Sequence, residues 1–168
     1  MRIYLVGFMG SGKSTLGPIL AEKLGLTFID LDQRIESSER KSIPEIFAGQ
    51  GENHFRKLER ATLIAALKED NFVLACGGGT PCFSDNMDLM KKTGLVLYLK
   101  FSPKKLSERL KNSGDARPLL LPGPGVSLEN HISEMLEKRE PFYKMANYTL
   151  KNPDAEELKD FILKTSNQ

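Results

Sequence analysis

Apolar runs of strand length alternate along the chain with stretches in which apolar side chains recur at helical spacing. The first three runs are short and apolar, as strands buried on both faces of a parallel sheet are. Strands that alternate with helices favour an α/β fold built on a parallel sheet. The predicted strands are Ile3–Val6, Thr27–Ile29, Phe72–Cys76, Leu95–Leu99 and Tyr148–Leu150.

Helix signals stand between these runs. The stretch Lys13–Leu24 carries apolar residues on one face and is followed by Gly25, a residue suited to closing a helix. Ser42 and Glu45 have the order and spacing of a capping box, which predicts a helix start. Further helices are predicted at residues 33–38, His54–Leu67, Ser102–Leu110, Ser127–Lys138 and Asp154–Leu163.

One segment follows neither period. Residues 111–125 read KNSGDARPLLLPGPG, with three glycines and three prolines. A structureless loop of this length in a compact domain is usually a lid or a disordered insert. Arg117 lies in the middle of this segment.

Composition and charge limit the class of protein. With 168 residues, 40% apolar and 27% charged, the chain is expected to form one soluble domain over residues 1–168. A net charge of +2 gives no electrostatic case for a nucleic acid or membrane partner, and no targeting segment or membrane-spanning run is found. Cys76 and Cys82 are expected to be reduced thiols of a cytoplasmic protein.

The segment GFMGSGKST, residues 7–15, carries the strongest chemical signal. Gly7, Gly12, Lys13 and Ser14 satisfy the P-loop pattern, with a predicted strand before and a helix after. Backbone N–H groups of such a loop surround phosphate oxygens at a helix N-terminus. We therefore expect Lys13 to reach the β- and γ-phosphates of a nucleotide and Ser14 to ligate Mg²⁺.

The P-loop alone does not name a reaction, because switches, motors and small-molecule kinases share it. The chain has neither the N-K-x-D tetrad nor a D-x-x-G motif, which argues against a GTPase switch.

Two aspartates follow the second predicted strand. Asp30 and Asp32 lie where the carboxyl ends of parallel strands gather ligands. Two residues apart on an extended chain, both carboxylates are expected to point to the same side, one toward Mg²⁺ water and one toward an acceptor hydroxyl. The alternative is that the pair caps a helix, since Asp32 precedes a helical stretch.

Glycines and arginines complete the candidate chemistry. Gly77–Gly79 follow the third strand, and three consecutive glycines suit a main chain that a ligand must approach closely. Arg56 starts a helix, the unfavourable end for a cation, which indicates an anionic partner nearby. Arg139 is expected at a helix end, where a role at the surface is equally open. A guanidinium matches a carboxylate with two parallel hydrogen bonds.

Together these residues resemble the shikimate kinase family, a branch of P-loop enzymes related to nucleoside monophosphate kinases. The resemblance covers nearly the whole chain and preserves the family's order and spacing. Its marks are GFMGSGKST, FIDLD, IPEIFAGQGENHFRKLE, GGG, RPLL and REPFY.

The resemblance implies ATP-dependent phosphorylation of the 3-hydroxyl of shikimate, a step of chorismate and aromatic amino-acid biosynthesis. It implies a three-layer α/β/α fold with a five-stranded parallel sheet in the order 2-3-1-4-5. It also implies a shikimate-binding helical segment near residues 31–60, a mobile lid at 111–125 and Mg²⁺ as cofactor. ATP and shikimate are the expected partners, and we expect a monomer.

The resemblance also implies roles for single residues. Asp32 contacts the receiving hydroxyl, as a base or only as a positioner, and Asp30 supports Mg²⁺ through water. Glu59 orients Arg56. The implied catalytic residues are Lys13, Asp32 and Arg117, and those that bind the acceptor are Asp32, Arg56, Gly78 and Arg139. The implied ATP-binding residues are Gly10, Ser11, Gly12, Lys13, Ser14, Thr15, Arg117 and Lys151.

Three alternatives stay open. Arg109 or Lys111, instead of Lys151, could contact adenine. The acceptor could be gluconate or a nucleoside monophosphate, in which case Arg56 and Arg139 need another anion. The chain could also be a non-catalytic ATP-binding module, although such a module requires neither Asp32 nor the glycine run.

Overall fold

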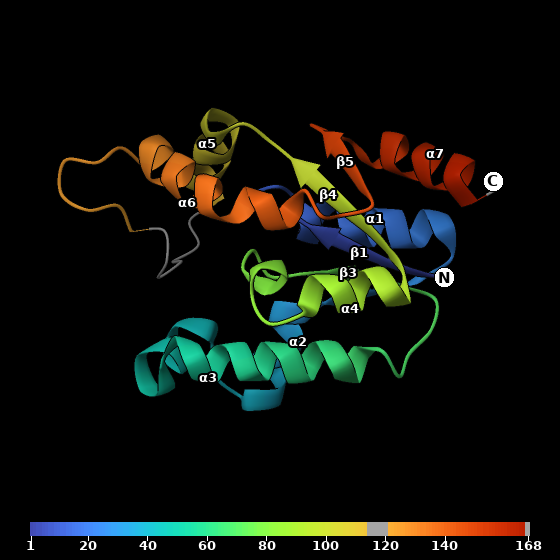
Figure 1. Cartoon of the computed structure of the whole chain (residues 1–168), viewed down its shortest axis with the longest axis horizontal. Coiled ribbons are helices and arrows are strands. Elements are labelled where there is room, and N and C mark those ends of the chain that lie inside the picture. Colours follow the sequence, from blue (N-terminus) through green and yellow to red (C-terminus); the bar gives the residue numbers. More distant parts are fainter. Residues whose placement is uncertain (114–120, 167–168) are drawn as a thin grey trace.

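The computed structural model describes residues 1–113 and 121–166. Five parallel strands form one sheet in the order β2-β3-β1-β4-β5, the order that the family resemblance implies (Figure 1). Each strand bound differs from the sequence prediction by no more than one residue. The strands are β1 (Arg2–Val6), β2 (Thr27–Asp30), β3 (Phe72–Ala75), β4 (Leu95–Lys100) and β5 (Tyr148–Lys151).

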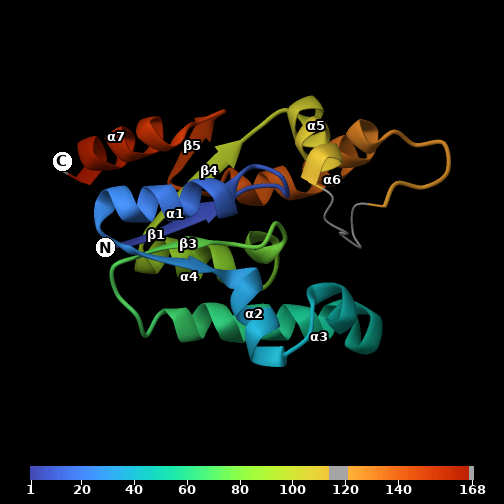
Figure 2. The same cartoon turned by 180° about the vertical axis from the view of Figure 1, so that it is seen from behind.

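Helices cover both faces of this sheet, as Figures 1 and 2 show from opposite sides. Helices α1 and α7 lie side by side on one face and α4 lies on the other, which gives three layers. Helices α5 and α6 pack together, as do α2 and α3. The helices are α1 (Lys13–Leu24), α2 (Leu31–Glu39), α3 (Ile43–Ala66), α4 (Asn86–Thr93), α5 (Pro103–Ser113), α6 (Leu128–Tyr143) and α7 (Ala155–Ser166), with a short 3₁₀ helix η1 (Thr80–Cys82).

Several helix predictions are confirmed and others are wrong at their ends. Gly25 closes α1 in the left-handed conformation, and Ser42 and Glu45 form the predicted capping box of α3. The prediction that a helix ends at Lys138 is wrong, because α6 continues through Pro141 to Tyr143. Pro141 removes one hydrogen bond of the helix. The last turn is nevertheless held in place, because the Tyr143 ring is fully buried.

Two short helices were not predicted, and one predicted loop begins too early. Helix α4 has only eight residues and η1 three, too few for a helical period to stand out. Helix α5 runs to residue 113, so the first three residues of the predicted lid at 111–125 are helical. Arg117 lies outside the described residues.

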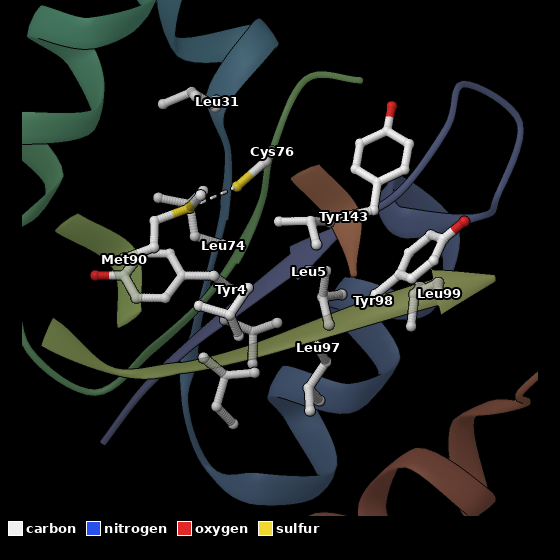
Figure 3. Close-up of a cluster of buried hydrophobic side chains, with 14 of the residues drawn as sticks. Tyr4, Leu5, Leu31, Leu74, Cys76, Met90, Leu97, Tyr98, Leu99 and Tyr143 are labelled. Atoms are coloured by element: carbon white, nitrogen blue, oxygen red, sulfur yellow. Dashed lines mark hydrogen bonds between the residues drawn. The ribbon is translucent and has the colours of Figure 1, made fainter. Parts of the chain in front are cut away.

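The core fills the space between the sheet and its helices (Figure 3). Every residue of β3 is buried, as are residues 3–6 of β1, which agrees with the apolar runs of the sequence. Three tyrosines contribute the largest buried side chains. The Tyr4 hydroxyl meets Thr93 Oγ1 at 2.8 Å, and the rings of Tyr98 and Tyr143 pack with centroids 5.1 Å apart.

Helix α1 approaches strand β2 closely because of a glycine. A Cβ at Gly17 would lie 2.3 Å from Cε2 of Phe28, well inside van der Waals contact. The ring of Phe28 therefore occupies the space that a side chain at position 17 would need, and it fixes the distance between α1 and the sheet.

We expect Gly17→Ala to lower the free energy of unfolding by about 1–3 kcal/mol, because the added methyl overpacks the contact with Phe28. Urea denaturation followed by circular dichroism measures the change. Gly49→Ala is the matched control, because a Cβ there meets nothing within 4 Å. Alanine in the helix should make that variant about 0.5–1 kcal/mol more stable. A Gly17→Ala protein as stable as the parent would contradict the packing argument.

Candidate active site

A cavity of about 970 Å³ lies at the carboxyl end of the sheet and joins the P-loop to helix α3. The switch point of a doubly wound sheet lies there, between strands whose connections run to opposite faces. Most of the predicted site residues line this cavity. They are Gly10, Gly12, Lys13, Ser14, Thr15, Asp30, Asp32, Arg56, Gly78 and Arg139.

The P-loop connects β1 to α1 with the backbone that its glycines allow. Gly10 and Gly12 have φ values of 81° and 88°, in the left-handed region that other residues avoid. Lys13 lies folded over this loop, and its Nζ donates to the carbonyl oxygens of Gly7 at 2.7 Å and Phe8 at 2.9 Å. The same ammonium donates to Oγ of the buried Ser11 at 3.3 Å, and Ser11 is not among the residues that line the cavity.

The P-loop serine and the first aspartate are hydrogen-bonded to each other. Ser14 Oγ donates to Asp30 Oδ2 at 2.7 Å. The other oxygen of Asp30 accepts from the backbone N–H of Gln33 at 3.2 Å, which makes Asp30 the N-cap of α2. The carboxylate thus has a structural role and also faces the loop hydroxyl predicted to bind Mg²⁺.

The predicted geometry of the aspartate pair is wrong. Asp32 does not lie on an extended chain, because Asp30 caps the helix and α2 begins at Leu31. Capping is therefore done by Asp30, and Asp32 lies in the first helical turn. Both aspartates still line the cavity, with Asp32 on the side toward Gly77.

The three glycines make room for charged side chains of the protein itself. A Cβ at Gly77 would lie 2.8 Å from Asp32 Oδ1 and 2.9 Å from Glu59 Oε1. A Cβ at Gly79 would lie 2.6 Å from both terminal nitrogens of Arg56. The sequence suggested close approach of a ligand, and the structure adds this internal reason for the glycine run.

Arg56 is held on several sides. Its Nη1 donates to Glu59 Oε2 at 2.9 Å, the contact that the resemblance implies. Its Nε and Nη2 donate to one oxygen of Glu52 at 3.2 and 3.0 Å. The ring of Phe83 covers the guanidinium, 4.1 Å from its central carbon. The prediction that Arg56 starts a helix is wrong, because α3 runs from Ile43 to Ala66 and Arg56 lies within it. The carboxylates near Arg56 belong to two residues of its own helix.

Glu59 is held by a residue that the sequence analysis missed. Thr80 Oγ1 donates to Glu59 Oε1 at 2.5 Å, and both side chains are buried. Asn86 in turn donates to the Thr80 carbonyl at 2.9 Å and accepts from Arg60 at 2.8 Å. These contacts join α3, η1 and α4, segments that no local pattern places together.

Arg139 approaches from the opposite wall of the cavity, on α6. Its guanidinium lies over the ring of Phe8, 5.7 Å from the centroid, and near Gly78. The extension of α6 beyond Lys138 puts Arg139 inside the helix rather than at its end. Nearby, burial raises the pKa of the Cys82 thiol to about 11, although Arg139 and Arg56 oppose the rise.

Arg109 of helix α5 contacts the P-loop. Its Nη1 donates to the carbonyl of Gly10 at 3.3 Å, and the guanidinium stacks on Phe101 at 4.2 Å. Arg109 lines the cavity, together with Pro153 and Asp154, which the sequence analysis did not select. Lys151 is exposed at the end of β5 and is absent from the lining.

The described residues hold no group of three or more His, Cys, Asp or Glu side chains suited to a metal ion. A divalent ion bound mainly by phosphates needs only one or two protein oxygens, as Ser14 and Asp30 would provide. Within the same part of the chain, no helix is long and apolar enough to cross a membrane.

Known proteins resemble this chain over nearly its whole length. The family described as shikimate kinase matches residues 9–166. A shikimate kinase of Parabacteroides distasonis is 44% identical over 94% of this chain and 89% of its own length. The crystal structure of the Bacteroides thetaiotaomicron shikimate kinase superposes with a TM-score of 0.84 at 38% identity, covering 99% of this chain and 97% of that one.

Two further solved structures resemble the chain at different levels of sequence identity. An Acinetobacter baumannii shikimate kinase in complex with shikimate has a TM-score of 0.87 at 37% identity and covers 99% of this chain and 94% of that one. A deoxyadenosine kinase of M. mycoides with bound dATP has a TM-score of 0.65 at 17% identity, with all of both chains covered. The latter shares the fold alone.

We expect Glu59→Gln to lower the free energy of unfolding by about 1–3 kcal/mol, because it removes the charge that Arg56 meets inside the protein. Glu52→Gln removes the other partner of the same arginine and serves as the control. The Glu52 side chain is 44% exposed against 1% for Glu59, so its loss should cost about 0–1 kcal/mol. Urea denaturation of both variants gives the comparison, and equal losses would contradict the ranking.

Proposed function

The chain belongs to the shikimate kinase family, and we propose that it transfers the γ-phosphoryl group of ATP to the 3-hydroxyl of shikimate. The products are shikimate 3-phosphate and ADP, a step toward chorismate and the aromatic amino acids. One observation carries the proposal: a single cavity joins the P-loop to the paired cations Arg56 and Arg139. A phosphate site and a carboxylate site within one cavity suit a kinase whose acceptor is an acid.

The donor half is the P-loop. We assign the phosphates of ATP to the backbone N–H groups of residues 10–15 and to Lys13. That ammonium is held by loop carbonyls, so binding ATP exchanges these neutral acceptors for phosphate oxygens, a stronger interaction. For the adenine end, Arg109 and Pro153 are better supported than Lys151, because they line the cavity.

Mg²⁺ fits the residues beside the P-loop. Ser14 and Asp30 offer hard oxygens 2.7 Å apart, the donor type that Mg²⁺ prefers, with waters and phosphates as further ligands. We assign the ion to Ser14 directly and to Asp30 through water. When bound, it neutralises charge on the phosphoryl oxygens.

The acceptor half lies across the cavity. We assign the carboxylate of shikimate to Arg56, Arg139 and the amide of Gly78. Asp32 lines the same space, and we assign it to accept a hydrogen bond from the 3-hydroxyl of shikimate and orient this hydroxyl for in-line attack. In the loose transition state of phosphoryl transfer, positioning and charge stabilisation supply most of the acceleration. Asp32 therefore contributes chiefly by holding the hydroxyl in place.

The remaining assignments follow from the sequence. We assign residues 31–60 to shikimate binding and 111–125 to a lid that excludes water during transfer. Arg117, outside the described residues, is assigned to the transferring phosphoryl group. The enzyme is proposed to act as a monomer in the cytoplasm, without nucleic acid or membrane partners.

ADP release, measured in parallel with shikimate, gluconate and nucleoside monophosphates, tests this function. We expect turnover with shikimate alone. Turnover with gluconate or a nucleotide would assign the chain to another kinase activity, and no turnover with any acceptor would favour a nucleotide-binding module.

We expect Arg56→Lys to raise the shikimate KM about 10–100-fold and to change the ATP KM by less than about twofold. Lysine keeps the charge but loses the planar fork that binds a carboxylate with two hydrogen bonds. Initial rates over both substrates measure the two constants. Arg34→Lys is the control, because Arg34 pairs with Glu69 outside this cavity. A similar rise in both constants would refute the carboxylate assignment.

A further inference from the structure

A buried tyrosine is bonded to the backbone of the glycine run. The Tyr143 hydroxyl donates to the carbonyl oxygen of Gly78 at 2.5 Å. The tyrosine is fully buried, and its ring lies beside that of Tyr98 in Figure 3. The two ring centroids are 5.1 Å apart. It ends α6, one helical turn after Arg139. The same helix thus carries a cation that lines the cavity and a donor that holds the opposite loop.

The hydrogen bond sets the orientation of one peptide group. The Gly78 carbonyl and the Gly79 N–H belong to the same peptide, and the described chain has no cis peptide bond. In a trans peptide the N–H points away from the carbonyl, so the Gly79 N–H faces away from Tyr143. The preceding peptide is set separately, because the Thr80 N–H donates to the Gly77 carbonyl at 3.1 Å.

The glycines of these two peptides line the cavity. Gly78 and Gly79 both line it, beside Arg139 and Arg56. Neither N–H group donates to a backbone carbonyl within the described part of the chain. Three glycines in a row have no side chain to hold their peptide planes, so an external contact must do so. Tyr143 supplies that contact from behind the loop.

We propose that Tyr143 is a positioning residue for the acceptor: it fixes the Gly78–Gly79 peptide so that the N–H of Gly79 faces the carboxylate bound by Arg56 and Arg139. The inference rests on the proposed function and extends it. Tyr143 and Arg139 lie one turn apart on α6, so the helix also fixes the distance between the Gly79 N–H and the Arg139 guanidinium. Burial raises the pKa of Tyr143, so its hydroxyl stays a proton donor across the neutral range.

Tyr143→Phe removes the donor and keeps the ring. We expect the shikimate KM and Kd to rise about tenfold, because the freed peptide no longer presents the Gly79 N–H to the shikimate carboxylate and one hydrogen bond to an anion is lost. The ATP KM should stay within about twofold of the parent value. Tyr98→Phe is the matched control, because that buried hydroxyl donates to Glu140, at 3.4 Å, and not to the loop. Its shikimate KM should equal the parent value.

A merely structural role would give a different result. If both variants lower the melting temperature alike and neither changes the shikimate KM, Tyr143 only packs, and the inference fails while the function stands. If the parent protein shows no turnover with shikimate, the proposed function itself fails.

An independent measurement does not depend on the variant folding. In ¹⁵N-labelled parent protein, saturating shikimate should shift the Gly79 amide proton downfield, as a new charged acceptor does. A Gly79 resonance that shikimate leaves unchanged would overturn the inference.

Discussion

The parallel register between β1 and β3 is the constraint on which the site depends. Leu5 pairs with Ala75, and the next amide, that of Cys76, donates to the Leu5 carbonyl at 3.1 Å. The two strands therefore end together, and the P-loop and the glycine run leave the sheet side by side. The two loops that we propose to bind the phosphates of ATP and the carboxylate of shikimate are thus set next to each other by ordinary ladder hydrogen bonds.

A buried carboxylate, that of Glu59, holds helix α3 next to the glycine run at the carboxyl end of the sheet. Glu59 is 1% exposed, and taking a carboxylate from water is costly unless charge and hydrogen bonds replace the lost hydration. Arg56 and Thr80 replace it, one from α3 and one from η1. Because the Glu59 carboxylate needs both partners, α3 stays next to the glycine run and Arg56 keeps its orientation.

The sheet, most helices and the P-loop were predictable because their signals are local. An apolar run predicts β3, and GKST after a strand predicts the loop, without knowledge of distant residues. Asp32 was misplaced because one cap residue decides where a helix begins, and Asp30 and Asp32 both suit that position. Thr80, Phe83 and Tyr143 act through contacts with residues far away in the chain, and no spacing in the sequence reports such contacts.

The fit of Arg56 between Phe83, Gly79 and Glu59 has a thermodynamic consequence. A free arginine side chain holds about 2 kcal/mol of rotamer entropy, which a ligand must overcome when it immobilises the guanidinium. Here the Phe83 ring, 4.1 Å away, and the bare backbone of Gly79 already restrict the side chain in the folded protein. The entropy of the Arg56 side chain is therefore lost when the protein folds and not when the ligand binds, so the arginine is pre-organised. Any residue other than glycine at position 79 would disturb that geometry, so the loop is constrained as much by its neighbouring arginine as by its ligand.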